Sequence, residues 1–344
     1  MKKIIHSLLV LCCLLCPATL KAYDFMVDGI AYNKNSNGIS VTVTYKNYYG
    51  EYSGVITIPS EIIYDNNYKI TAIGFAAFLG CRELTSVTIP NTVATISDYA
   101  FLDCHALTEL AIPYSIKSIG NYAFAFCYGL ESIVVDNANT VYDSRNNCNA
   151  IIETASNKLI AGCYRTIIPS SVTSIGANAF WGISDLNSFR IGMNVNTIGA
   201  SAFHDCPGLR SITIPKSVIS IGDEVFYGCK DLKAIYCYIN DPSSVSMGSE
   251  IFKGVPINNC VLHVPMGTKS LYYQVEQWKD FSHIVDDLTI GTGDVNGDGS
   301  VNVVDITALI DIIMNDCTDD RADVNGDGKV NVSDITALIN VILN

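Results

Sequence analysis

Two nearly identical stretches near the C-terminus carry the side chains with the clearest chemical potential. They read DVNGDGSVNVVDITALIDIIMN (294–315) and DVNGDGKVNVSDITALINVILN (323–344), and 17 of their 22 positions are identical. Each opens with a 12-residue loop whose oxygen-bearing side chains recur at positions 1, 3, 5, 9 and 12, while position 7 can supply its backbone carbonyl. Ca²⁺ is a hard cation that takes six to eight oxygen ligands at ~2.3–2.6 Å, so the sequence predicts two calcium ions, one in each loop. The predicted ligands are Asp294, Asn296, Asp298, Ser300, Asn302 and Asp305 in the first loop, and Asp323, Asn325, Asp327, Lys329, Asn331 and Asp334 in the second.

The two loops also have the turns and the charge that a bound cation needs. Gly299 and Gly328 stand at loop position 6, where the chain must turn sharply around the ion. Lys329 is compatible with binding because position 7 contributes only its carbonyl. Residues 286–344 hold twelve aspartates and only two basic residues, a net charge of −10, and such a dense charge of one sign favours a bound cation. A flexible Asp- and Gly-rich tail is the alternative interpretation, and the apolar run after each loop argues against it.

The runs after the loops have helical periodicity. Apolar residues recur at the spacing of one helix face, at Ile306, Leu309, Ile310 and Ile313 and at Ile335, Leu338, Ile339 and Ile342. No helix is expected before either loop, which differs from a true EF-hand. This duplicated loop-then-helix arrangement, with Asp at loop position 12, resembles the type I dockerin family over all of 294–344. The resemblance implies a small α-helical module that binds calcium and presents a helix face to a cohesin module of another protein. Thrombospondin-type calcium repeats are a weaker match, because they lack the following helices.

The positions that would recognise a partner depart from the dockerin pattern. Members of that family often carry Ser-Thr-like pairs at loop positions 10 and 11, and both loops here have valine at position 10. This departure leaves the identity of the cohesin open, and it allows the Val303-Val304 pair to dock on the protein's own repeats instead. The predicted partner-binding residues of the module are Val303, Val304, Ile310, Asp311, Val332, Ser333, Ile339 and Asn340.

A 23-residue period organises most of the remaining chain. One unit reads LTSVTIPNTVATISDYAFLDCHA (84–106) and another reads LRSITIPKSVISIGDEVFYGCKD (209–231). Val87 and Ile89 alternate with polar residues, as in a strand with one buried face, and Phe101 is placed to fill the interior. A single unit cannot bury these side chains, but stacked units share one continuous core.

The repeats resemble the BspA-like leucine-rich repeat family over about residues 56–285, including the closing segment VLHVPMGTKSLYYQVEQWKDFSHIV. The resemblance implies a β-rich leucine-rich-repeat solenoid of 23-residue coils that serves as an adhesin or binding platform. Alternating residues predict a strand-rich N-terminal cap, and the segment 136–162 predicts an inserted hairpin on the flank of the solenoid. The predicted domains are a signal peptide (1–22), an N-terminal β cap (23–55), repeats with their closing segment (56–285), a linker (286–293) and a dockerin (294–344).

One strand position of each repeat is expected to face solvent and forms a nearly uncharged ladder across the coils. It becomes larger and more polar toward the C-terminal end, where Arg190 and Tyr236 occupy it. A plain solvent-facing sheet explains most of the ladder. Arg190 and Tyr236 are the predicted ligand-binding residues on this face, because Arg and Tyr are enriched at binding hot spots.

The cysteines are predicted to be mainly buried thiols rather than a disulfide framework. Five of them occupy one repeat position that also accepts Ile183, so the position behaves as an apolar slot. Cys148 and Cys163, which bracket the inserted hairpin, are the predicted exception, a disulfide.

The N-terminal residues predict export. Ile4–Cys16 is almost wholly apolar after two lysines, and Ala22 offers a small residue for cleavage. A lipoprotein signal is the rival interpretation, but a bulky residue precedes each cysteine of this stretch. We therefore expect a secreted or cell-surface protein. No later stretch is long and apolar enough for a membrane span.

The composition argues against two further classes of function. The net charge is −13 for the whole chain, which argues against a nucleic-acid partner because phosphate contacts need clustered Lys and Arg. The five histidines are scattered, and the sequence holds no nucleophile motif such as G-x-S-x-G and no phosphate-binding glycine loop. The sequence thus predicts a non-catalytic protein.

The leading hypothesis is an exported adhesion protein, with the repeats binding a host protein or a glycan and the dockerin attaching it to a cohesin-bearing partner. One alternative is a non-catalytic subunit of an extracellular polysaccharide-degrading complex. Another is that the calcium module only caps the solenoid.

Overall fold

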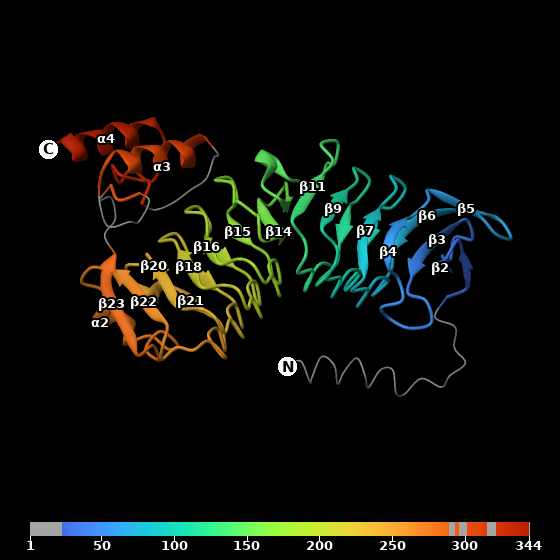
Figure 1. Cartoon of the computed structure of the whole chain (residues 1–344), viewed down its shortest axis with the longest axis horizontal. Helices are drawn as coiled ribbons and strands as arrows, with labels where there is room; N and C mark the ends of the chain where they lie inside the picture. The colour runs from blue at the N-terminus through green and yellow to red at the C-terminus, as the bar shows by residue number, and fades with distance from the viewer. Residues whose placement is uncertain (1–22, 289–292, 296–300, 315–320, 344) are drawn as a thin grey trace.

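The computed structural model describes residues 23–288, 293–295, 301–314 and 321–343. Its main body is a solenoid of stacked coils, and two helices lie beside the C-terminal end of that solenoid (Figure 1). A regular coil contributes one longer strand and one two-residue strand, and each pairs in parallel with its counterpart in the next coil. The predicted fold class, a β-rich leucine-rich-repeat solenoid followed by a small α-helical module, is confirmed.

An antiparallel meander begins the described part of the chain, where the sequence predicts a strand-rich cap. It consists of β1 (Phe25–Val27), β2 (Ile30–Lys34) and β3 (Ser40–Thr44). The buried hydroxyl of Tyr52 ties the meander together, because it donates to the Thr44 carbonyl (2.7 Å) and accepts from the Ala31 amide (3.0 Å). β3 then pairs in parallel with β6 (Asn67–Ile73) and so joins the meander to the coils.

The longer strands of the regular coils form one face of the solenoid. Their two-residue strands form another face, which also carries the strands next to the N-terminal cap and those of the inserted hairpin. The longer strands are β4 (Gly54–Thr57), β7 (Leu84–Thr88), β9 (Glu109–Ile112), β11 (Ser132–Val135), β16 (Ser188–Arg190), β18 (Ser211–Ile214), β20 (Ala234–Cys237), β22 (Val261–Pro265) and β23 (His283–Leu288). The second face contains β5 (Glu61–Ile63), β6 (Asn67–Ile73), β8 (Thr95–Ile96), β10 (Ser118–Ile119), β12 (Tyr142–Asp143), β13 (Ala150–Glu153), β14 (Lys158–Gly162), β15 (Ser174–Ile175), β17 (Thr197–Ile198), β19 (Ser220–Ile221) and β21 (Ser246–Met247). The helical segments are η1 (Arg145–Asn147), η2 (Pro242–Ser244), α2 (Lys269–Tyr272), α3 (Val303–Met314) and α4 (Val332–Leu343).

A stack of phenylalanine rings fills the interior, one ring from each coil. Phe78, Phe101 and Phe124 form the first part of the stack, with ring centroids 5.0 and 5.7 Å apart. The stack resumes at Phe180 and continues through Phe203, Phe226 and Phe252 at 5.1 to 5.7 Å. The buried apolar side chains accordingly form two large clusters, one in each half of the solenoid. Full burial of each ring stabilises the fold by roughly 1.5–3 kcal/mol.

The repeat cysteines are buried thiols, as predicted. The sequence did not reveal their contacts: each of four thiols donates to the carbonyl of a phenylalanine in the preceding coil at 3.1–3.2 Å. Burial raises the pKa of Cys127 to about 12, so the thiol stays protonated and keeps its donor. These donors are Cys104, Cys127, Cys206 and Cys229.

The predicted disulfide between Cys148 and Cys163 is wrong. Both side chains are free thiols in the structure. The Cys163 thiol lies 3.3 Å from the Glu131 carbonyl and 3.5 Å from the Asn149 carbonyl, whereas the Cys148 sulfur contacts the Ala150 carbonyl at 3.9 Å. Each sulfur is therefore placed against a different carbonyl partner by the hairpin's own fold. The predicted hairpin itself is present, as the antiparallel pair β13–β14.

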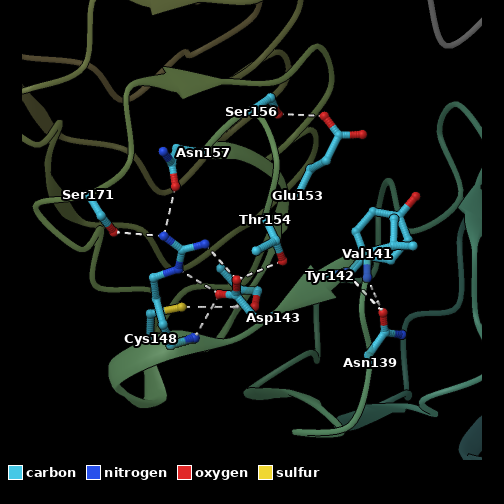
Figure 2. A network of polar contacts seen from close by, with 12 residues as sticks. Asn139, Val141, Tyr142, Asp143, Cys148, Glu153, Thr154, Ser156, Asn157 and Ser171 are labelled. Atoms are coloured by element: carbon cyan, nitrogen blue, oxygen red, sulfur yellow. Dashed lines mark hydrogen bonds and ion pairs between the residues drawn. The ribbon is translucent and has the colours of Figure 1, made fainter.

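A polar network fastens the inserted hairpin to the coil that follows it (Figure 2). The Arg145 guanidinium donates to both oxygens of Asp143 at 2.7 and 2.5 Å. One of its terminal nitrogens also donates to Asn157 Oδ1 (2.8 Å) and to the Ser171 hydroxyl (3.1 Å). The Thr154 hydroxyl completes the set by donating to Asp143 Oδ2 at 2.9 Å. The insertion is thus a fixed part of the solenoid.

Membrane-spanning helices were sought in the described residues, and none of the helices there has the length and apolar character to cross a bilayer. The predicted signal peptide, residues 1–22, lies outside the described residues.

Candidate calcium loops and binding surfaces

The second loop, 323–334, is described in full and is already folded around its own carboxylates. Asp323 Oδ2 accepts from the Gly328 amide (3.0 Å), and the two oxygens of Asp334 accept from the Asn325 (3.2 Å) and Asn331 (2.9 Å) amides. Gly328 has a φ of 81°, a left-handed conformation that side-chain-bearing residues rarely adopt, which explains glycine at loop position 6. These bonds orient the first and last carboxylates toward the centre of the loop.

Short-range bonds from the remaining ligand candidates shape the rest of this loop. Asn325 Oδ1 accepts from the Asp327 amide (2.8 Å), and Asp327 Oδ1 accepts from the Lys329 amide (2.9 Å). Asn331 Oδ1 accepts from the Ser333 amide (2.9 Å) and thereby bonds the first turn of α4. Asparagine and aspartate are needed at these positions because their short side chains reach nearby backbone amides.

The described part of the first loop follows the same design. Asp305, like Asp334, is completely buried and accepts from the amide at loop position 9, here Asn302 (2.9 Å). Asn302 Oδ1 in turn accepts from the Val304 amide at 2.9 Å. Asp294 is half-buried at the start of the loop. The other three predicted ligands, Asn296, Asp298 and Ser300, lie outside the described residues.

The second loop fits a cation on the evidence of its buried carboxylates. Asp323 and Asp334 are both fully buried, and Asp323 Oδ1 has no hydrogen-bond partner. A buried carboxylate without compensation costs several kcal/mol, so such an oxygen requires a positive charge. The Lys216 ammonium of the repeats lies 3.4 Å from the other Asp323 oxygen and supplies part of that charge.

The donor set suits calcium better than a transition metal. Within the described residues, no three His, Cys, Asp or Glu side chains are gathered so that they could hold a metal by themselves. The loop instead offers Asn oxygens and the carbonyl of Lys329 beside its three carboxylates, a hard all-oxygen set of the kind that calcium accepts. Asp323, Asn325, Asp327, Lys329, Asn331 and Asp334 are the residues that would hold the ion.

The two helices pack against each other and leave matching faces outside. Leu309 of α3 and Leu338 of α4 are completely buried in a small core. Val303 and Val332 open the two helices and are 66% and 68% exposed. All eight predicted partner-binding residues of this module are exposed: Val303, Val304, Ile310, Asp311, Val332, Ser333, Ile339 and Asn340.

The structure bears on two alternatives raised by the sequence. Val304 is 54% exposed, so the Val303-Val304 pair is not docked on the repeats. The last coil is covered by the closing segment rather than by the calcium module: the completely buried Trp278 packs on Phe252 with ring centroids 4.9 Å apart. The Tyr272 hydroxyl secures that segment by donating to the Ile239 carbonyl at 2.6 Å.

The predicted ligand-binding residues of the repeats lie on the outer face of the longer strands. Arg190 is exposed and is paired in register with Thr213, which in turn pairs with Tyr236. The sequence analysis missed that the row continues to His263, whose ring stacks on Tyr236 at 4.6 Å and contacts the Asp287 carboxylate at 2.9 Å. Recognising β22 as the next strand of the repeat would have placed His263 beside Tyr236 in this row.

A ladder of aromatic rings also runs along the turns after the two-residue strands, and sequence analysis did not single it out. Tyr99 stacks on Tyr122 (5.0 Å), which meets the edge of Trp181 (5.1 Å). Trp181 contacts His204 (4.4 Å), and His204 stacks on Tyr227 (4.7 Å). The signal available was an aromatic or His residue beside each repeat phenylalanine. It stands two positions before the phenylalanine in the first half (Tyr99, Tyr122) and one position after it in the second half (Trp181, His204, Tyr227).

Comparison with known proteins decides the family. The sequence model of the BspA type leucine rich repeat region matches residues 57–156 and 161–274, with six copies, which together are more than half of the chain. This chain belongs to the BspA-type leucine-rich repeat family. The model of the dockerin type I domain matches residues 292–343 of this BspA-type protein. No curated protein matches the chain.

Solved structures similar to this BspA-type protein are bacterial leucine-rich repeat proteins. A leucine-rich repeat protein from Bacteroides ovatus shares 25% identity over 70% of this chain and 71% of its own, with a TM-score of 0.39. A leucine rich cell surface protein from Faecalibacterium prausnitzii shares 17% identity over 79% of this chain and 96% of its own, with a TM-score of 0.43. The T. pallidum leucine-rich repeat protein shares 24% identity over 67% and 88%, with a TM-score of 0.39.

The two matched families carry general implications. Leucine-rich repeats and dockerins are typically non-catalytic. Type I dockerins typically bind calcium, and a dockerin implies a cohesin partner. Both families are typically extracellular or attached to the cell surface.

Proposed function

We propose that this BspA-type protein is an exported, non-catalytic binding arm, whose repeats hold a glycan or protein ligand while its calcium-loaded dockerin attaches it to a cohesin-bearing partner. The observation that carries the proposal is the pairing of buried loop carboxylates with exposed apolar helix faces. The fully buried Asp305 and Asp334 lie one turn from the exposed Val303 and Val332. Calcium binding would therefore set the position of the surface that meets the partner.

Electrostatics supports two calcium ions, one in each loop. Asp323 Oδ1 is buried without a hydrogen-bond partner, and residues 286–344 carry a net charge of −10. Each divalent ion would neutralise carboxylates that otherwise repel one another in a poorly solvated loop. The ion would also lock the loop against its helix, because Asp305 and Asp334 belong to the first turn of α3 and α4.

Duplication gives the dockerin two similar candidate faces. Val303, Val304 and Ile310 on α3 correspond to Val332, Ser333 and Ile339 on α4. Contiguous exposed apolar residues are characteristic of interaction surfaces. Because the two faces differ at few positions, we expect a partner that binds one face to bind the other face as well.

Binding of residues 23–344 to a panel of purified type I cohesin modules tests the attachment. We expect binding in millimolar calcium and none with excess chelator. Asp334→Ala should weaken binding by lowering calcium affinity on the order of 100-fold, because it removes one carboxylate of the ligand set. The double variant Val303→Asp/Val332→Asp should abolish binding while calcium affinity persists, and each single variant should retain part of it.

Val55→Asp is the matched control, because Val55 is 69% exposed on β4 of the repeats, far from the dockerin in sequence. It should bind every cohesin as the unchanged protein does. The attachment is wrong if calcium binds with the expected affinity and no cohesin of the panel is captured, or if Val55→Asp and the double variant lose binding equally.

A further inference from the structure

The solenoid has one irregular junction, between the coil that ends near Cys127 and the coil that begins at β14. At regular junctions the turn carrying the repeat phenylalanine donates three backbone hydrogen bonds to the next coil. Examples are Tyr99 to Asn121, Phe101 to Ala123 and Asp103 to Ala125, at 2.8–3.0 Å. At the irregular junction the described chain makes one such bond, from the Phe126 amide to the Trp181 carbonyl (3.0 Å). The coils before and after the inserted hairpin are therefore held together less closely at this junction than at the others (Figure 1).

The inserted hairpin causes this separation. Elsewhere the Ile-Gly turn of a coil presses on the backbone of the preceding turn, so that a Cβ on Gly199 would lie 2.5 Å from the Ala177 nitrogen. Gly176 instead meets the hairpin, with the Leu159 carbonyl and the Lys158 side chain as its neighbours. The turn of Gly120 is thus left without a coil directly behind it. A cavity of about 180 Å³ opens there, lined by residues of both halves.

Three residues that line this cavity carry hydrogen-bond donors without a partner in the described chain. The amides of Tyr122 and Phe124, which by position would bond to the next coil, have no partner in the described chain. The indole nitrogen of Trp181 is buried without a partner, and the whole side chain is only 8% exposed. Buried donors of this kind are rare and call for an acceptor. Asn121 and Asn178 add two side-chain amides to the lining.

The only charged residue among those lining the cavity is a cation. Lys158 is half-buried on β14, and no described carboxylate lies within ion-pair distance of its ammonium. The neighbouring Asn157 is held by Arg145, so the strand that presents Lys158 is fixed in place (Figure 2). Its ammonium is therefore available to an anionic group that enters the cavity. Asp98 of the preceding coil accepts from the Asn121 amide (2.7 Å) and does not line the cavity.

We propose that this cavity binds one carboxylate-bearing sugar residue, a uronic acid. The ammonium of Lys158 would pair with the carboxylate, while the backbone, indole and Asn donors would bond to hydroxyl and ring oxygens. The apolar remainder of the lining, such as Ala123, Ala125 and Ile160, suits the C–H face of a sugar ring. A volume of 180 Å³ is far above the ~15 Å³ that one water needs and below the ~300 Å³ where pockets for drug-sized ligands begin.

This inference rests on the proposed function, since it names the ligand class of the repeats. It favours a glycan over a protein for this site, because a cavity of this size admits one sugar residue rather than an extended protein surface. Exposed Asn121 and Ala177 lie at its rim, so the sugar can remain attached to a longer chain.

Tryptophan fluorescence of residues 23–344 offers a direct test. The chain holds two tryptophans, and Trp278→Phe leaves Trp181 as the reporter. Galacturonate, a trigalacturonate oligomer and the neutral galactose oligomer of equal length are the probes. We expect the two acidic probes to change the Trp181 emission and the neutral oligomer to bind at least tenfold more weakly. A stronger response to the oligomer than to the free acid identifies a polysaccharide as the source, and the reverse identifies a free sugar acid.

Lys158→Met tests the charge, because methionine keeps the length of the side chain and removes the ammonium. The substitution should lower the affinity for both acidic probes at least tenfold without changing the melting temperature of the protein. Lys233→Met, at an exposed lysine that does not line the cavity, is the control and should leave binding unchanged. Ala177→Leu at the rim should block the binding of all probes.

The proposal is overturned if no acidic probe binds, or if Lys158→Met and Lys233→Met bind the acidic probes with equal affinity. Calcium-dependent cohesin binding by the same samples reports separately on the attachment.

Discussion

Phe203 in the repeats and Asp334 in the dockerin are both completely buried, yet burial has opposite consequences for the two regions. Phe203 packs between Phe180 and Phe226 in a stack that continues from coil to coil, so its burial stabilises the solenoid without any ligand. Asp334 is a buried carboxylate whose oxygens accept only backbone amides of its own loop. Repetition thus produces a core that needs no ligand in one region and, in the other, buried carboxylates that the proposed function pairs with calcium.

Calcium removal should separate the two regions most clearly. With each ion at 1,000 times its dissociation constant, binding stabilises the dockerin by about 4 kcal/mol per ion. Excess chelator should therefore unfold α3 and α4 while the repeats keep their melting temperature. Calorimetry with and without chelator measures both transitions. A fall in the melting temperature of the repeats would show that the calcium module caps the solenoid after all.

The reciprocal change is Phe203→Ala. Removal of a fully buried ring from a stack should cost about 3–5 kcal/mol, because the coils on either side cannot close the cavity. Calcium titration should give unchanged affinities, since no contact joins Phe203 to the loops. Denaturant unfolding measures the loss, and Phe75→Ala is the control, because Phe75 is 57% exposed. Equal losses for the two variants would contradict a stability based on the buried stack.

A smaller effect is expected from Cys206→Ala. The change removes the hydrogen bond to the Phe180 carbonyl (3.1 Å) and leaves a small void, which together should cost about 1–2 kcal/mol. Reducing agents should not alter the stability of the unchanged protein, because the described cysteines are free thiols. A marked destabilisation by reductant would indicate a disulfide and contradict the structure.

The smallest effect concerns the ion pair between the two regions. Lys216 lies 3.4 Å from Asp323, a predicted ligand of the second loop. Lys216→Met should raise the calcium affinity of that loop two- to fivefold, because the ammonium competes with the ion and a partly exposed pair is worth under ~1 kcal/mol. Isothermal titration calorimetry measures the change, with Lys233→Met as the control. A lower affinity in Lys216→Met would mean that the repeats help to shape the loop.

Much of the architecture could be predicted because it repeats. The period that aligns Leu84 with Leu107 predicted stacked coils, and the alternation of Val87 and Ile89 predicted a buried strand face that the structure confirms. The helices after the loops followed from the spacing of Leu309 and its neighbours. Periodicity works here because neighbouring coils meet in the same way each time.

The Cys148–Cys163 disulfide was a wrong prediction for the opposite reason. These cysteines lie around an insertion that occurs once, so no second copy reveals how its side chains are oriented. Sequence spacing brings the two residues to the base of one hairpin, but the β-bulge between Ile151 and Ile152 and the contact of Cys163 with Glu131 depend on the folded backbone. Proximity in sequence does not determine the direction of a side chain.

The residue types and their spacing determined the repeat fold and the exposed positions of α3 and α4, and they predict the ligand set of the loops, because these features depend on local periodicity and on short side chains that bond to nearby amides. Only the tertiary structure decided where the solenoid is interrupted. The amides of Tyr122 and Phe124 lost their expected partners because the hairpin displaced the next coil. Lys158 came beside them from another segment. A single non-repeating insertion thus creates a pocket that repeats alone would have closed.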